Sequence, residues 1–264
     1  MKTALITGAS SGIGEIFAKE LASRKTNLVL VARSEDKLQQ LANQLQSQYQ
    51  IHADVIVQDL TAPAATNSVF ETVSQKGLTI DLLINNAGFG DYGKFTERPL
   101  EKQVNMIQLN ITALVELTHL FLPGMQQNKS GAIINVSSIG GFQPLPYMSV
   151  YGATKAFVLS FSEALWAENQ DSGVKILALC PGPTESEFFQ RAEFPKSVGG
   201  SSMSKLTPTE EVVKDALQAL EKNQSNTVTG GFLNQVIVNA SRFFPRETLV
   251  SVVEKQFKSI KQNN

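Results

Sequence analysis

The chain has 264 residues, of which 42% are hydrophobic and 18% charged, and its formal net charge is -1. This composition supports a buried core and excludes a disordered chain, and the near-zero charge gives no global attraction to nucleic acid. The single cysteine, Cys180, and the two histidines exclude an internal disulfide and a cysteine- or histidine-rich metal site. We expect a cytoplasmic protein without a metal, a nucleic-acid partner or an integral membrane segment.

Short apolar runs alternate along the chain with longer segments of helical spacing. The runs predict strands over residues 3–7, 28–32, 53–57, 82–85, 132–136, 175–179 and 235–238. Helical spacing follows most of them, beginning with residues 13–23. Continuous alternation of this kind predicts an α/β fold, a doubly wound parallel sheet of about seven strands with helices on both faces. We expect residues 1–264 to form one domain.

Two segments depart from the alternation. Residues 183–207 are too long for an ordinary connection and contain Gly199-Gly200-Ser201-Ser202, which is typical of a lid or binding loop. Residues 241–264 form a C-terminal extension in which residues 246–261 have the spacing of an amphipathic helix. This helix has two interpretations, packing against the body or a sister subunit, and a membrane-surface role supported by its lysines.

The first predicted strand ends in a glycine-rich turn, residues 7–14, that leads directly into a helix. Glycines let the backbone approach a pyrophosphate, and the helix N-terminus supplies free N–H groups. The spacing is G-x-x-x-G-x-G rather than the commoner G-x-G-x-x-G, and a plain tight turn is the alternative. The turn predicts a dinucleotide site that includes Gly8, Ser10, Ser11, Gly12, Ile13 and Gly14.

The residues after the second predicted strand indicate which dinucleotide binds. An NAD site would place an acid about 20 residues beyond the glycines, to accept a hydrogen bond from the ribose 2′-hydroxyl. Ala32 and Arg33 stand there instead, and a guanidinium can bind a 2′-phosphate through two parallel hydrogen bonds. Ser34 and Ser10 add hydroxyl donors. We predict NADP(H), with a solvated surface charge as the alternative interpretation of Arg33.

Three further residues form a candidate catalytic set. Tyr151 and Lys155 are four residues apart in a segment of helical composition, so they share one helix face. Ser138 follows the predicted strand 132–136 on the side where ligands bind in open parallel sheets. A neighbouring ammonium lowers the pKa of a tyrosine from about 10 toward neutral pH. Tyr151 could then exchange a proton with a carbonyl oxygen while Ser138 hydrogen-bonds the same atom.

Taken together, these motifs resemble the short-chain dehydrogenase/reductase family over roughly residues 1–190. The matching pieces, in the family's order and spacing, are Thr7 to Gly14, Asp59, Asn85-Asn86-Ala87-Gly88, Asn110, Ser137-Ser138, Tyr151-Gly152-Ala153-Thr154-Lys155 and Pro181-Gly182. The resemblance implies a Rossmann-like fold and hydride transfer between a nicotinamide and a carbonyl carbon.

The resemblance also implies individual roles. Lys155 would bind the nicotinamide ribose, and Asn110 would hold a water of the proton relay; a helix-end cap is the alternative for Asn110. The remaining cofactor contacts would come from Asp59 and Leu60 at the adenine, from Asn86, Ala87 and Gly88, and from Pro181 and Gly182 beneath the nicotinamide. The family usually has Thr five residues after that proline. Here Ser186 stands there, with Thr184 nearby as a substitute.

Apolar side chains around these motifs indicate a hydrophobic substrate pocket. We expect it to include Phe89, Tyr92, Phe142, Leu145, Tyr147, Met148, Phe188, Phe189 and Met203. Such a pocket favours a hydrophobic ketone, aldehyde or alcohol, with 3-oxoacyl thioesters and steroids as alternatives. A dinucleotide-binding regulator without redox chemistry is the second hypothesis. Family dimers commonly use the helices that here contain Asn110 and Tyr151, so we expect a homodimer or a homotetramer.

Overall fold

The computed structural model describes residues 2–194, 206–240 and 243–262, and within them seven strands form one parallel sheet. The sheet order is β3-β2-β1-β4-β5-β6-β7. The strands are β1 (Thr3–Thr7), β2 (Asn27–Ala32), β3 (Ala53–Val57), β4 (Leu82–Asn85), β5 (Gly131–Val136), β6 (Val174–Cys180) and β7 (Asn226–Val228). The predicted doubly wound sheet is confirmed, and its order reverses between β1 and β4.

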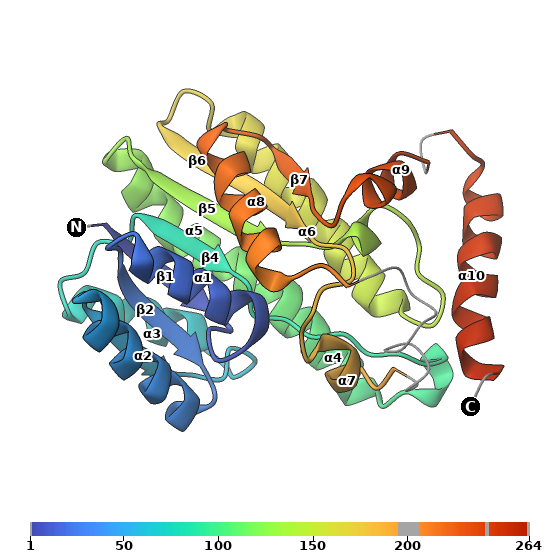
Figure 1. The fold of residues 1–264 in the computed structure, drawn as a ribbon, viewed down its shortest axis with the longest axis horizontal. Helices are drawn as coiled ribbons and strands as arrows, with labels where there is room; N and C mark the ends of the chain where they lie inside the picture. Colours follow the sequence, from blue (N-terminus) through green and yellow to red (C-terminus); the bar gives the residue numbers. More distant parts are fainter. Residues whose placement is uncertain (1, 195–205, 241–242, 263–264) are drawn as a thin grey trace.

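Helices cover both faces of this sheet (Figure 1). The α-helices are α1 (Gly12–Ser23), α2 (Glu35–Tyr49), α3 (Ala65–Gln75), α4 (Leu100–Ile107), α5 (Ala113–Gln127), α6 (Ser149–Glu168), α7 (Phe188–Arg191), α8 (Thr209–Glu221), α9 (Phe232–Ala240) and α10 (Arg246–Gln262). Short turns η1 (Phe95–Glu97) and η3 (Ile139–Gly141) are 3₁₀ helices, and η2 (Gln108–Thr112) is a π-helical turn. The predicted helix over 246–261 is confirmed as α10.

The strand sequences explain the two layers. In β2, Leu28 and Leu30 pack with α1, α2 and α8, whereas Val29 and Val31 pack with α3 and α5 on the opposite face. Successive side chains of a strand point to opposite faces, so a strand buried on both faces is apolar throughout. This is why the apolar runs that predicted the strands are continuous and do not alternate with polar residues.

The prediction of a strand over residues 235–238 was wrong. Those residues lie in α9, and the seventh strand is the short, half-buried segment β7 that precedes Gly230 and Gly231. A four-residue apolar run has the same composition in a strand and in a buried helix face. The inner face of α9 is fixed by Asn234, which is buried and donates hydrogen bonds to the carbonyls of Thr229 (2.8 Å) and Gly230 (3.2 Å).

One long helical segment contains a strongly apolar stretch. Among the described residues, Leu100–Gln127 is long and apolar enough to cross a membrane, and an 18-residue stretch within it has a mean hydropathy of 1.2. Core helices of globular proteins meet the same criterion. In this fold the α5 part packs Leu117 and Phe121 against the sheet, beside Val69 of α3.

Candidate active site

A cavity of about 680 Å³ lies at the carboxyl ends of the central strands, where the sheet order reverses. This is the position at which open α/β sheets bind ligands. Nearly all of the predicted cofactor residues line it: Gly8, Ser10, Ser11, Gly12, Ile13, Arg33, Ser34, Asp59, Leu60, Asn86, Ala87, Gly88, Tyr151, Lys155, Pro181, Gly182, Thr184 and Ser186. Gly14 does not line the cavity and lies behind the turn.

The glycine turn is shaped so that its backbone faces the cavity. Gly8 and Gly12 have φ angles of 64° and 57°, in the left-handed region that favours glycine. A Cβ on Gly14 would lie 2.4 Å from the Gly8 carbonyl oxygen, so only glycine fits there. Ser11, at the N-cap of α1, makes no side-chain capping bond. The first N–H groups of α1 are therefore suited to receive a pyrophosphate, and the turn fits a dinucleotide.

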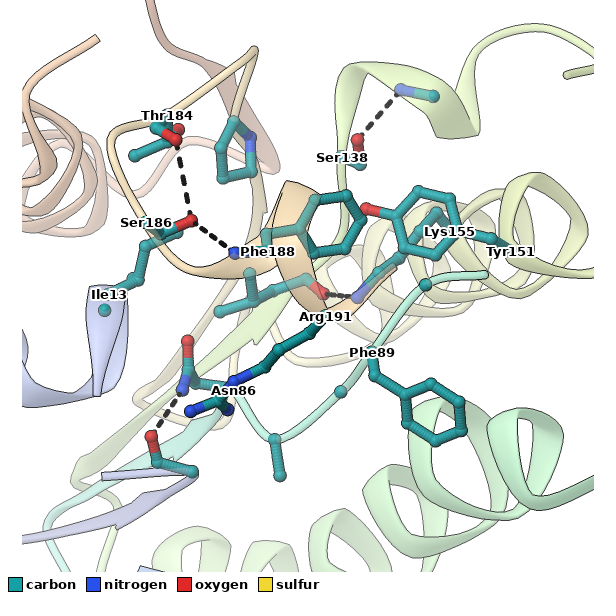
Figure 2. Close-up of a pocket in the computed structure, with 18 of the residues that line it drawn as sticks. Ile13, Asn86, Phe89, Ser138, Tyr151, Lys155, Thr184, Ser186, Phe188 and Arg191 are labelled. Atoms are coloured by element: carbon teal, nitrogen blue, oxygen red, sulfur yellow. Dashed lines mark hydrogen bonds between the residues drawn. The ribbon is translucent and has the colours of Figure 1, made fainter. Parts of the chain in front are cut away.

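Asn86 joins the end of β4 to this turn. Its side-chain amide donates to the carbonyls of Thr7 (2.9 Å) and Gly8 (3.2 Å), as Figure 2 shows in part. The Thr7 hydroxyl in turn accepts the backbone N–H groups of Asn86 and Ala87, both at 3.0 Å. These bonds hold the glycine turn after β1 against the chain that follows β4.

Arg33 lies at the far end of the cavity, as predicted for a 2′-phosphate site. Its guanidinium is 74% exposed and stands 3.7 Å from the Asp59 carboxylate. Burial would raise the pKa of Asp59, but hydrogen bonds from Thr61 and the charge of Arg33 outweigh it and lower that pKa. Asp59 therefore stays ionised and holds Arg33 at the adenine end of the cavity. Exposed ion pairs of this kind exchange readily for a stronger anion.

Ser138, Tyr151 and Lys155 converge on the opposite end of the cavity (Figure 2). Ser138 follows β5 and is held by the Gly140 N–H, which donates to its Oγ at 3.0 Å. The Ser138 side chain faces the Tyr151 ring in Figure 2. One helical turn on from Tyr151, the Lys155 Nζ lies 5.8 Å from the centre of the tyrosine ring and donates to the Val136 carbonyl at 2.7 Å. The three groups are positioned by β5 and α6.

Burial dominates the ionisation of this set. It raises the pKa of Tyr151 to about 12, although the neighbouring Ser138 hydroxyl acts in the other direction. It lowers the pKa of Lys155 to about 8, because an ammonium is poorly solvated there. The sequence prediction that Lys155 lowers the Tyr151 pKa toward neutrality was therefore wrong in this structure. Tyr151 is a protonated acid at neutral pH.

Asn110 is buried inside a helix rather than at its end. It lies in the π-helical turn η2 between α4 and α5, so the helix-cap alternative does not hold. Its amide donates to the Phe89 carbonyl (3.0 Å) and to the Thr154 hydroxyl (3.1 Å), and its oxygen accepts the Phe89 N–H (3.1 Å). Asn110 thereby ties the chain after β4 to the helix that carries Tyr151.

The two candidate hydroxyls after Pro181 are used differently. Thr184 is buried and donates to the Gly182 carbonyl at 2.9 Å. The Ser186 hydroxyl accepts the Phe188 N–H at 3.3 Å and contacts the Thr184 carbonyl at 3.5 Å (Figure 2). Both side chains line the cavity, and Ser186 also holds the N–H of Phe188, the first residue of α7.

Helix α7 covers the cavity within the predicted lid, of which residues 195–205 lie outside the described residues. The Phe188 ring lies over Tyr151, with ring centres 5.2 Å apart. Arg191, which the sequence analysis missed, extends from α7 toward the Asn86 side of the cavity in Figure 2 and pairs with Glu187. A lone arginine in a loop of uncertain conformation gave no signal of this placement.

A buried charge cluster anchors this lid. The Asp91 side chain is fully buried and accepts hydrogen bonds from Arg98 (2.5 and 2.7 Å) and Gln103 (2.6 Å), with the Lys102 Nζ at 2.7 Å. Glu193, just after α7, pairs with Arg98 (2.7 Å) and Lys102 (2.5 Å). Although burial would raise the pKa of Asp91, the bonds and charges of these cations lower it. The cluster links the lid to the start of α4.

The substrate end of the cavity was predicted only in part. Phe89, Leu145, Met148, Phe188 and Phe189 line it. Tyr92 and Tyr147 stack on each other outside it, Phe142 packs against Leu159 and Cys180, and Met203 lies outside the described residues. The lining residues that were missed include Gln143, Glu187, Arg191, Asn234, Ile237, Gln256 and Phe257. Four of these belong to α9 and α10, and the incorrect strand at 235–238 hid α9 from the sequence analysis.

The fold and site together define a dinucleotide-binding oxidoreductase of the doubly wound class. A family model described as short chain dehydrogenase matches residues 2–195, and the chain belongs to this family.

Named relatives agree with this assignment. The chain is 32% identical over 268 residues to a very-long-chain 3-oxoacyl-CoA reductase of Anas platyrhynchos, covering 98% of this chain and 80% of the relative. Among solved structures, a short-chain dehydrogenase from Sphingobium yanoikuyae in complex with NADPH superposes with a TM-score of 0.82 at 35% identity, over 95% of each chain. A bulky-bulky ketone specific alcohol dehydrogenase from Comamonas testosteroni gives 0.79 at 32% identity, over 95% of this chain and 94% of its own.

Proposed function

We propose that this oxidoreductase uses NADP(H) to interconvert a hydrophobic ketone or aldehyde and the corresponding alcohol. The observation that carries the proposal is that Ser138 and the buried Tyr151, with Lys155 one helical turn away, line one cavity together with the glycine turn. A pure dinucleotide sensor has no need of this arrangement. The regulator hypothesis is therefore the weaker one.

The chain's own groups handle the proton. Bound NADP(H) would supply or accept the hydride. Tyr151 donates its phenolic proton to the carbonyl oxygen during reduction, and a pKa of about 12 keeps that proton in place at neutral pH. Ser138, which lines the cavity beside Tyr151, is positioned to hydrogen-bond the same oxygen. The Lys155 ammonium beside the ring stabilises the phenolate left after the transfer.

The preference for NADP(H) rests on Arg33. It is the cation that lines the adenine end of the cavity, and no acidic residue occupies the position at the end of β2 where NAD sites place one. Asp59 pairs with Arg33 and so leaves that end of the cavity less positive than a lone arginine would. The NADPH complex of the Sphingobium yanoikuyae relative supports the same choice.

The substrate end of the cavity favours an apolar molecule. Phe89, Leu145, Met148 and Phe188 surround the approach to Tyr151. The names of the relatives, one acting on 3-oxoacyl-CoA and one on bulky ketones, support two substrate classes of this kind. We favour a bulky ketone, with a 3-oxoacyl thioester or a steroid as the alternative.

The test is a cofactor-oxidation screen. The purified protein is mixed with NADPH or NADH and with ketones, aldehydes, 3-oxoacyl thioesters and steroids, and the loss of absorbance of the reduced nicotinamide is followed. We expect turnover with hydrophobic carbonyls and a clear preference for NADPH. Tight binding of NADPH without turnover on any of these classes would favour the regulator instead.

We further propose that the protein is a cytoplasmic homodimer formed through α4, η2 and α6. Leu100, Val104 and Ile107 of α4 and Phe157 of α6 are exposed large hydrophobic residues. Apolar surface of this kind on two neighbouring helices is typical of a contact between subunits. Light scattering of Val104→Lys beside the wild type would test it, because a dimer should become a monomer.

A further inference from the structure

The last two helices lie at one edge of the molecule (Figure 1), and exposed apolar side chains gather on α9 and just after it. Phe232, Leu233 and Val236 share the outer face of α9, and Phe243 and Phe244 follow it. Phe232 is 83% exposed and Phe243 81%. We call these five residues the C-terminal patch. Single exposed apolar residues need no explanation, but five within 13 positions mark a binding surface.

The C-terminal segment that carries the C-terminal patch is basic, whereas the rest of the chain is acidic. Residues 232–264 contain five of the chain's 23 Lys and Arg and only two of its 24 Asp and Glu. Of these, Arg246, Lys255 and Lys258 are exposed on α10, together with the acidic Glu247. Lys255 and Lys258 lie on the side of the helix opposite the buried Val253.

The same two helices form a wall of the cavity on their inner sides. Asn234 and Ile237 of α9 and Gln256 and Phe257 of α10 line it. The C-terminal patch is therefore separated from the substrate end of the cavity by the thickness of α9 and α10. An apolar substrate dissolved in an apolar layer against the C-terminal patch would therefore have a short path into the cavity.

We propose that the C-terminal patch docks the enzyme on an anionic lipid bilayer. Exposed aromatic rings insert at the level of the headgroups, and neighbouring Lys and Arg are attracted by acidic lipids. A second copy of the chain fits this surface less well, because a two-fold contact would bring the basic residues of both copies together. The exposed hydrophobic residues of α4 and α6 offer such a copy another apolar surface.

Vesicle flotation tests the proposal with the full-length protein. Phosphatidylcholine vesicles with and without phosphatidylserine are mixed with the wild type, with Phe232→Ser/Phe243→Ser, and with Lys255→Gln/Lys258→Gln. Phe95→Ser on η1 is the matched control, because Phe95 is 57% exposed outside the C-terminal patch. Activity on a water-soluble ketone shows that each variant is folded, because none of these side chains lines the cavity.

The wild type and Phe95→Ser should float with the acidic vesicles and be released by high salt. Partitioning should weaken by about tenfold or more in the double phenylalanine variant, since each ring loses its apolar burial. The double lysine variant should lose the preference for phosphatidylserine. Absence of binding by the active wild type, or equal binding by all variants, would overturn the proposal. So would a loss of self-association in the double phenylalanine variant without any vesicle binding, because a second copy would then cover the C-terminal patch.

Discussion

The buried Asp91 is expected to be the most costly single charge to remove. Asp91→Asn removes the negative charge between Arg98 and Lys102 and replaces an acceptor of their hydrogen bonds with an amide. The Asp91 side chain is 0% exposed and that of Arg98 only 19%, so water cannot replace the lost partner. Breaking a buried pair of this kind lowers the free energy of unfolding by about 3–5 kcal/mol.

Urea unfolding at neutral pH measures this loss, and Glu193→Gln is the matched control. The Glu193 side chain contacts the same two cations but is 56% exposed, so its loss should cost at most about 1 kcal/mol. Because Glu193 ties the lid, that variant should instead raise KM with little change in stability. If Asp91→Asn unfolds within about 1 kcal/mol of the wild type, the assignment of the cluster as a buried anchor is wrong.

The pH dependence of the Asp91 contribution has a definite sign. The folded-state pKa of Asp91 is lowered, so its contribution is complete above the unfolded value of about 3.9. It is lost as the pH falls through the folded pKa. The stability difference between the wild type and Asp91→Asn should stay constant down to about pH 4 and shrink below it.

Four further substitutions test other parts of the molecule. Arg33→Ala should weaken binding of NADPH much more than binding of NADH by fluorescence titration, and equal losses would refute the 2′-phosphate role. Gly14→Ala should destabilise the protein by about 1–3 kcal/mol and weaken NADPH binding, since its Cβ meets the Gly8 carbonyl. Gly124→Ala, with open space around it inside α5, should stabilise by about 0.5–1 kcal/mol in the same unfolding assay. Lys155→Met should abolish turnover yet raise stability at pH 7 by about 1–3 kcal/mol, because the lowered pKa of Lys155 means that its charge opposes folding. The wild type should gain the same free energy of unfolding as the pH rises from about 8 to 10 and Lys155 loses its proton. If Lys155→Met is no more stable than the wild type at pH 7, burial does not lower the pKa of Lys155 in this way.

The spacing of residues in the sequence predicted those parts of the site that depend on a single helix or a single turn. Tyr151 and Lys155 needed only a helix to share a face, and the glycine turn needed only a strand before it and a helix after it. Asn110 was singled out correctly, but its place in a π-helical turn depends on the packing of Phe89 and Thr154, which the sequence does not show.

The missed features depend on long-range packing. The wall formed by α9 and α10 could not be predicted because residues 235–238 fit a strand as well as a helix. Tyr92 looked like a pocket residue, yet its hydroxyl donates to the Phe257 carbonyl at 2.8 Å, from a helix 165 positions further along the chain. The Tyr151 pKa was predicted in the wrong direction because the tyrosine is buried by Phe188 and its surroundings, and burial is a property of the whole fold.

The central claim is that Tyr151 gives a proton to a carbonyl that receives a hydride from NADPH. It is tested most directly with NADPH deuterated at the reactive carbon of the nicotinamide and a bulky ketone. The wild type should place one deuterium on the carbinol carbon of the product alcohol, as seen by mass spectrometry. Tyr151→Phe should bind NADPH with unchanged affinity and form almost no alcohol. Deuterated product formed at the wild-type rate by Tyr151→Phe, or NADPH oxidation without deuterium in the alcohol, would contradict the account.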